Sequence, residues 1–169
     1  MFSFEAGKEY SNHHVYFILY IDFKHMINYE GDMVFTSSRR IDFPMVDIAG
    51  IVYYPRFWDL AHRFYEESWE YTCGMHYNLV LQKHRIGFPL VHSEANFLHP
   101  LKYGDTAFCK ISVSKIGNTS ITWLYEISNQ DDKLCWTANQ TTVCTNMDNI
   151  TEKINVPKWM REGLVKITS

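Results

Sequence analysis

The sequence predicts an α+β domain in which an antiparallel sheet curls around one long central helix. Three observations predict this class. A strand pattern at 34–43 comes first, one helical pattern follows at 55–71, and four extended runs separated by turn residues occupy 90–146. One strand, one long helix and then a series of strands is an order typical of α+β proteins.

The first strand and the helix are marked by their periods and by proline. Alternate residues of 34–43 share one side of the predicted strand: Phe35, Ser37, Arg39, Ile41 and Phe43. Pro44 ends this strand. Pro55 suits the first position of a helix, and apolar residues recur from there to about Tyr71 with a period near 3.6. Cys73-Gly74 is typical of a helix end.

Four extended runs follow a more variable stretch at 75–89. They are LVHSEANFL (90–98), DTAFCKISVSKI (105–116), TSITWLYEIS (119–128) and KLCWTANQTTVCTN (133–146). Gly, Asn, Asp and Pro residues between the runs are typical of antiparallel connections, so we expect a four-strand meander. Pro157 then begins a short terminal helix that we expect to end near Ile167.

Length and charge restrict the class of protein. The chain has 169 residues, 46% of them hydrophobic and 21% charged, as in one soluble globular domain. Its 16 Lys and Arg against 19 Asp and Glu give a net charge of −3. We therefore expect neither nucleic acid nor membrane as a partner. The longest apolar run, 15–21, is about a third of the roughly 20 residues that a membrane span needs.

The four cysteines indicate a reducing compartment. Cys73, Cys109, Cys135 and Cys144 form no CxxC pair, and no second ligand pair matches the spacing of Cys73 and His76. We expect free thiols, no metal and a cytoplasmic location. The aromatic content of 16% is high, and these rings must fill a core, line a pocket or meet a partner.

Residues 1–32 differ in composition from the rest of the chain. They combine an aromatic run, three histidines and the acidic stretch 30–32. We interpret 1–32 as an N-terminal extension and 33–169 as the globular domain. The adjacent His13 and His14 are expected to be a solvated pair rather than metal ligands, since no carboxylate or Cys partner lies nearby in the sequence.

The segment VDIAGIVYYPRF (46–57) is the most informative of the chain. Asp47 stands in a mostly apolar stretch just before a helix whose first backbone N–H groups have no helical acceptor. Such a helix start can hold a phosphate, or the oxyanion that forms when a carbonyl is attacked. Apolar surroundings would raise the reactivity of the carboxylate. From the residues alone, Asp47 can equally be a solvated turn residue.

This segment resembles the Asp-x-x-Gly-(Ile/Val)-Val-(aromatic)-Tyr-Pro signature of hot-dog-fold acyl-CoA thioesterases of the 4-hydroxybenzoyl-CoA thioesterase type. GFPLV (87–91), Phe97 and PLKYGD (100–105) follow in the family's order and spacing, and the resemblance spans about residues 33–165. It implies a hot-dog fold and hydrolysis of an aromatic, 4-hydroxybenzoyl-like, or short-to-medium-chain acyl-CoA. No cofactor is implied, because coenzyme A is part of the substrate.

The resemblance also implies roles for individual residues. Asp47 is expected to act as nucleophile or general base, and the backbone N–H of Tyr54 to polarise the thioester oxygen. Substrate contacts are expected from eight further residues: Gly50, Tyr53, Pro55, His62, Phe88, Lys115, Asn118 and Thr119. Taken by itself, His62 can also be an ordinary packed or half-exposed helix residue.

The same resemblance implies a homodimer or homotetramer with active sites at the subunit boundary. Relatives grip the phosphates of coenzyme A with a basic cluster at a turn where this chain, at 115–119, keeps one Lys. This difference leaves an alternative open, a non-catalytic module that binds an acyl thioester or a lipid. Hydratases on the same fold use an Asp and a His that lie a few residues apart. Here the next histidine after Asp47 is His62, so a hydratase is disfavoured.

Overall fold

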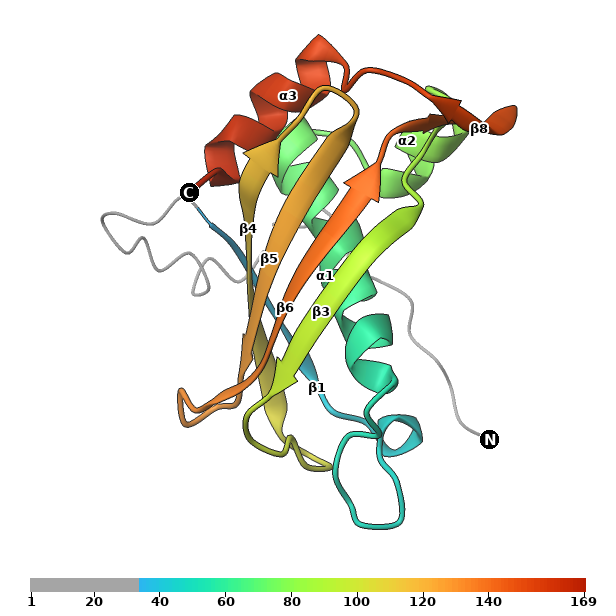
Figure 1. The fold of residues 1–169 in the computed structure, drawn as a ribbon. Coiled ribbons are helices and arrows are strands. Elements are labelled where there is room, and N and C mark those ends of the chain that lie inside the picture. Colours follow the sequence, from blue (N-terminus) through green and yellow to red (C-terminus); the bar gives the residue numbers. More distant parts are fainter. Residues whose placement is uncertain (1–33) are drawn as a thin grey trace, which may run out of the picture.

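A computed structural model of the chain describes residues 34–169. The predicted N-terminal extension, 1–32, lies outside the described residues, and its boundary stays a prediction. Five antiparallel strands form one sheet in the order β1-β4-β5-β6-β3, and this sheet curves around the helix α1 (Figure 1). The predicted α+β class, with an antiparallel sheet wrapped around one long central helix, is confirmed.

The described residues form two sheets and three α-helices. The large sheet contains β1 (Phe35–Arg40), β3 (Leu90–Phe97), β4 (Thr106–Ile116), β5 (Ser120–Ser128) and β6 (Leu134–Val143). A smaller sheet, in the order β2-β7-β8, contains β2 (Ile86–Gly87), β7 (Thr145–Asn146) and β8 (Asn149–Lys153). The helices are α1 (Arg56–Cys73), α2 (Tyr77–Gln82) and α3 (Lys158–Leu164).

The long helix has the limits that its sequence signals predict. It begins at Arg56, one residue after the predicted first position, Pro55, whose φ of −66° suits a helix start. Gly74 closes it in the left-handed conformation, with φ of 63°, as predicted. The apolar face of α1 packs on the sheet, and Trp69 lies fully buried near Trp123 of β5. This contact is part of one continuous core.

The first strand is shorter than predicted. β1 ends at Arg40, and Phe43–Met45 form a 3-10 turn where a strand over 34–43 was expected. Pro44 has no N–H for a sheet and holds φ near the helical range, so it favours a turn. Phe43 consequently lies outside the strand in which alternation placed it, and it is 76% exposed.

The strand order differs from the predicted four-strand meander. β4, β5 and β6 are consecutive neighbours, but β3 pairs with β6, and β4 pairs with β1. The connection from β3 to β4 therefore crosses the end of the sheet. Backbone hydrogen bonds fix this crossing, from Val52 N–H to Leu101 O at 2.8 Å and from Gly104 N–H to Ile41 O at 3.0 Å. The crossing thus lies beside the segment that precedes α1.

Two regions contain short elements that the sequence did not reveal. The stretch 75–89 holds α2 and β2, and the predicted strand at 133–146 divides into β6 and β7, with β8 following. These elements are too short to show a period. The predicted terminal helix is confirmed as α3 with a 3-10 turn at Val165–Ile167. Gly163 allows α3 to lie close against α1, because a Cβ at this position would lie only 2.7 Å from the carbonyl oxygen of Thr72.

β3 is an open edge of the large sheet and the least covered of its strands. All of its residues except Ala95 are exposed, whereas every second residue of β5 is buried. An edge strand presents one row of backbone N–H and C=O groups that a further strand can pair with.

Candidate active site

Asp47 begins a tight backbone loop between the first strand and α1. Val46 and Val52 pair across the base of the loop, and the Asp47 N–H donates to Ile51 O at 3.0 Å. The Gly50 N–H donates to Asp47 O at 2.9 Å, and Gly50 has a φ of 74°. The Asp47 Oδ1 accepts the Ala49 N–H at 2.8 Å. The loop therefore orients the carboxylate through its own backbone and leaves Oδ2 without a hydrogen bond among residues 34–169.

The expectation of apolar surroundings for Asp47 is wrong for a single chain. Asp47 is exposed, and its neighbour Ile48 is fully exposed. The reason is that the loop extends past the end of the sheet, where no described element of the same chain covers it. Residues 34–169 therefore do not enclose this carboxylate.

The start of α1 offers the expected backbone donor. The carbonyl oxygens of Tyr53, Tyr54 and Pro55 accept the first helical N–H groups, at 2.8, 3.3 and 3.2 Å. The Tyr54 N–H donates no hydrogen bond to any residue of the described range, and Tyr54 is 61% exposed. This N–H lies at the positive end of an 18-residue helix, where a developing oxyanion is stabilised.

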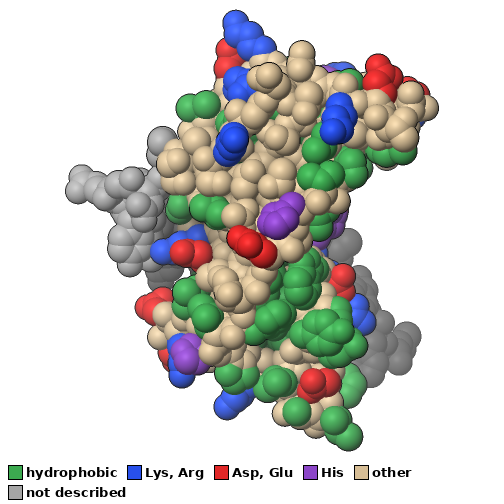
Figure 2. All heavy atoms as spheres, viewed as in Figure 1, with side chains coloured by type: hydrophobic (Ala, Val, Ile, Leu, Met, Phe, Trp, Pro, Cys, Tyr) green, Lys and Arg blue, Asp and Glu red, His purple; other side chains and the backbone are tan. Residues whose placement is uncertain are grey.

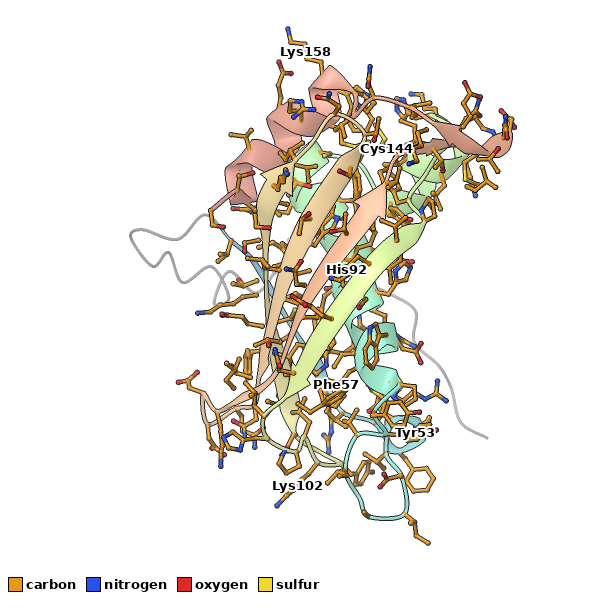
Figure 3. All side chains as sticks on the ribbon, viewed as in Figure 1. Tyr53, Phe57, His92, Lys102, Cys144 and Lys158 are labelled. Atoms are coloured by element: carbon orange, nitrogen blue, oxygen red, sulfur yellow. The ribbon has the colours of Figure 1, made fainter. Side chains whose placement is uncertain are left out.

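Five of the predicted site residues lie together at this end of the molecule. Asp47 and Gly50 belong to the loop, and 53–55 lead from it into α1. Lys102 flanks the loop, because it pairs with Ile51 and its neighbour Tyr103 donates to Gly50 O at 3.1 Å. Figure 3 shows Tyr53, Phe57 and Lys102 at this end and Lys158 at the opposite end.

Two predicted substrate contacts lie further from the helix start. They are His62 of α1 and Phe88, which lies between β2 and β3, and both contact the ring of Tyr77. The Tyr77 ring lies 6.0 Å from His62 and 6.0 Å from Phe88. The His62 Nε2 lies 3.1 Å from Glu66 Oε1, so this histidine has a partner on its own helix. Burial, followed by the charge of Glu66, raises the pKa of Tyr77 to about 12, and its hydroxyl is therefore neutral at physiological pH.

Lys115, Asn118 and Thr119 are not brought to the start of α1 within one chain. They lie at the turn between β4 and β5, which the Arg161 guanidinium of α3 holds through the carbonyl oxygens of Ile116 and Gly117, at 3.1 and 2.7 Å. This turn lies at the C-terminal end of α1 (Figure 1). An 18-residue helix is roughly 27 Å long, which separates the turn from Asp47.

An aromatic cluster beside the helix start went unpredicted as a unit. Phe57 stacks on Trp136 of β6 at 5.6 Å, and Trp58 lies 5.9 Å from Phe97 of β3. The Trp58 Nε1–H donates to Ser93 Oγ at 3.1 Å. Figure 2 shows hydrophobic side chains gathered at this lower end of the molecule. Helical spacing singled out Trp58, but its strand partners depend on the sheet order, which the sequence did not reveal.

The described residues show neither a metal cluster nor a membrane-spanning helix. Among residues 34–169, His, Cys, Asp and Glu side chains form no group of three or more that could hold a metal ion. No helix in this part of the chain is long and apolar enough to cross a membrane. The predicted histidine pair at 13–14 lies outside the described residues.

A sheet wrapped around one helix, with a carboxylate loop at the helix start, defines a hot-dog thioesterase architecture. The family model of the thioesterase-like superfamily matches residues 41–164, and the chain belongs to this superfamily. The 1,4-dihydroxy-2-naphthoyl-CoA hydrolase of Crocosphaera subtropica is 27% identical over 133 residues, which are 76% of this chain and 96% of the relative.

Solved structures agree on the fold. A 1,4-dihydroxy-2-naphthoyl-CoA thioesterase from Synechocystis has a TM-score of 0.70 at 24% identity, over 78% of this chain and 96% of its own. The gentisyl-coenzyme A thioesterase BH1999 has a TM-score of 0.67 at 22% identity, over 75% of this chain and 99% of its own. The predicted hot-dog fold and thioesterase family are confirmed. The 4-hydroxybenzoyl-CoA type stays a prediction, because these relatives are named for other aromatic acyl groups.

Proposed function

We propose that the protein hydrolyses an aromatic acyl-CoA to the free acid and coenzyme A. The observation that carries this proposal is the loop of Asp47 before the start of α1, where the Tyr54 N–H has no acceptor among residues 34–169. The relatives named for 1,4-dihydroxy-2-naphthoyl-CoA and gentisyl-CoA support an aromatic acyl group. A 4-hydroxybenzoyl group and short-to-medium aliphatic chains are the further candidates.

Hydrolysis at this site needs one carboxylate and one oxyanion donor. As general base, Asp47 takes a proton from water while the water oxygen bonds to the thioester carbonyl carbon. As nucleophile, its oxygen attacks that carbon directly, and water then cleaves the resulting anhydride. In both routes the carbonyl oxygen becomes negative and accepts the Tyr54 N–H. In the general-base route the carbon–sulfur bond then breaks, and the proton held by Asp47 passes to the leaving thiolate of coenzyme A. In the nucleophile route the carbon–sulfur bond breaks as the anhydride forms, and the thiolate takes up the proton released when water cleaves the anhydride.

We also propose that the active unit is a homodimer, alone or within a homotetramer, with the site at the subunit boundary. The open β3 edge and the exposed side chains of Ile48, Tyr53 and Phe97 support a second copy at this end. A second copy would enclose Asp47. It would also let Lys115, Asn118 and Thr119, distant in their own chain, contact substrate bound by the other chain.

We further propose a cytoplasmic location and a reaction without a cofactor. We place the enzyme in the cytoplasm, which is supported by four free cysteines, three of them buried. The proposed chemistry uses a carboxylate, a backbone N–H and water, and it requires no cofactor beyond the coenzyme A of the substrate.

A panel of acyl-CoA thioesters tests the proposed reaction. We expect thiol release from benzoyl-, 4-hydroxybenzoyl-, gentisyl- or 1,4-dihydroxy-2-naphthoyl-CoA, with hexanoyl-CoA as the aliphatic comparison. Product acids are measured by chromatography, so that the protein's own thiols do not contribute to the signal. Saturable binding without release from any member would contradict hydrolysis.

The alternative function, a non-catalytic acyl-thioester or lipid binding module, is favoured by one observation. The turn at 115–119 carries one Lys, and the nearby Arg161 guanidinium donates to two backbone carbonyl oxygens of that turn, so these N–H groups are already engaged within the chain. Binding that is equally strong for acyl-CoA and for a fatty acid, without thiol release, is the result that this alternative predicts.

A further inference from the structure

Four aromatic side chains form a stripe along one face of α1. Trp58, His62, Tyr65 and Trp69 are spaced by four, three and four residues, which places them on one side of a helix. The far part of the stripe is closed, because Tyr65 and Trp69 are buried and Trp69 packs on Phe88 at 4.9 Å. Trp58, near the start of α1, is partly exposed.

The ring of Trp58 is held in place with one side open. Its Nε1–H is bound to Ser93 Oγ at 3.1 Å, and its ring meets Trp136 in an edge contact at 5.8 Å. Phe97, 5.9 Å away, is 50% exposed at the end of β3. The two rings thus form a rigid aromatic surface that solvent reaches in the single chain.

Trp136, beneath this surface, gives a second and independent observation. It is fully buried, and its Nε1–H has no hydrogen-bond acceptor in the described part of the chain. A buried donor without an acceptor is costly, and such groups are rare in folded proteins. The rings beneath Trp58 and Phe97 therefore include a polar group that residues 34–169 leave unpaired.

Resting on the proposed thioesterase function, we propose that the acyl ring packs on Trp58 and Phe97, and that Trp58 sets the preference for aromatic over aliphatic acyl groups. The Tyr54 N–H would fix the thioester oxygen, and Trp58 lies four residues further, roughly 6 Å along the helix axis. A ring attached to the carbonyl spans that distance. Aromatic rings gain from edge and offset contacts beyond the area they bury, whereas an alkyl chain gains only from burial.

Substitution of Trp58 by Leu tests the preference. We expect Trp58→Leu to lower kcat/KM for benzoyl- and gentisyl-CoA about 10-fold relative to kcat/KM for hexanoyl-CoA. Trp159→Leu is the matched control. Trp159 is also partly buried, but it belongs to α3, at the opposite end of the molecule, where its ring lies 4.9 Å from the ring of His84. Its ratio of aromatic to aliphatic kcat/KM should stay within about twofold of wild type.

Two further variants keep the test decisive. Phe97→Leu, at a half-exposed position, should lower the same ratio, and it covers the case in which Trp58→Leu does not fold. Trp58→Phe removes the N–H but keeps a ring, so most of the preference should remain. Unchanged ratios in folded Trp58→Leu and Phe97→Leu would overturn the ring contact while leaving hydrolysis intact. Absence of thiol release by the wild type would overturn the proposed function itself, and this inference with it.

Discussion

Two side chains, the partly buried Tyr77 and the buried Cys144, predict a measurable pH dependence of stability. Burial raises the pKa of Tyr77 from 10.0 to about 12 and the pKa of Cys144 from 9.0 to about 12. The folded state therefore keeps protons that the unfolded chain releases. The stabilisation from these groups is complete below about pH 9 and is lost as the pH rises toward 12.

We predict that the double variant Tyr77→Phe with Cys144→Ala flattens the alkaline loss of stability. Urea midpoints are measured from pH 8 to pH 12 for wild type and variant. The wild-type midpoint should fall more steeply than the variant's above about pH 9, and the two slopes should agree below it. Parallel curves across the whole range would contradict the assignment of this pH dependence to Tyr77 and Cys144.

At the scale of residues, the sequence predicted the backbone around Asp47 and Tyr54 better than it predicted what surrounds these two residues. Asp47 and the Tyr54 N–H follow from a local motif, and the loop and helix start that hold them are local too. The exposure of Asp47 and the contact of Trp58 with Phe97 depend on which strand lies next to which. Such non-local contacts leave no period or turn signal in the chain.

Two secondary-structure elements depend on a glycine with positive φ. Gly50 closes the Asp47 loop with φ of 74°, and Gly74 ends α1 with φ of 63°. At neither position would a Cβ meet another atom within 4 Å, so the cost of Ala at both positions is backbone strain alone. A non-glycine residue in this conformation costs about 1–2 kcal/mol.

We predict that Gly50→Ala and Gly74→Ala lower the free energy of unfolding by similar amounts, about 1 kcal/mol each. Only Gly50→Ala should also lower kcat/KM, because Gly50 shapes the loop that orients Asp47. Urea unfolding and acyl-CoA turnover measure the two effects. Equal turnover in both variants would show that the loop has no part in catalysis.

The elements themselves were predictable where they were long. The 3.6 period of α1 and the turn residues around β4, β5 and β6 identified these elements with small errors at their ends. The position of β3 beside β6 was not predictable, because turn residues indicate where a strand stops but not its neighbour. Pro44 shortened β1 for a local reason, the missing N–H, that was visible in the sequence.

At the scale of the whole molecule, the edge of β3 pairs with no further strand among residues 34–169. Its side chains are almost all exposed, and the aromatic cluster of Trp58 and Phe97 adjoins it. Pairing of two β3 edges across a two-fold axis would continue the sheet from one chain to the next. The high aromatic content then serves the core, the interface and the acyl site together.

We predict a mass of two or four chains of 20.0 kDa in solution. Light scattering coupled to gel filtration measures this mass, and turnover is followed over the same range of protein concentrations. Specific activity should fall at dilutions where the oligomer dissociates. A monomer with undiminished activity would contradict a site shared between subunits.

The most direct test of the proposed reaction is the turnover of Asp47→Asn on an aromatic acyl-CoA. Asp59→Asn is the matched control, because Asp59 is an exposed carboxylate on the first turn of α1 that pairs with Arg56 at 2.7 Å. We expect Asp47→Asn to lower kcat about 10²- to 10⁴-fold with an unchanged melting temperature, and Asp59→Asn to retain turnover close to wild type. Turnover by Asp47→Asn within about twofold of wild type would contradict a catalytic role for this carboxylate.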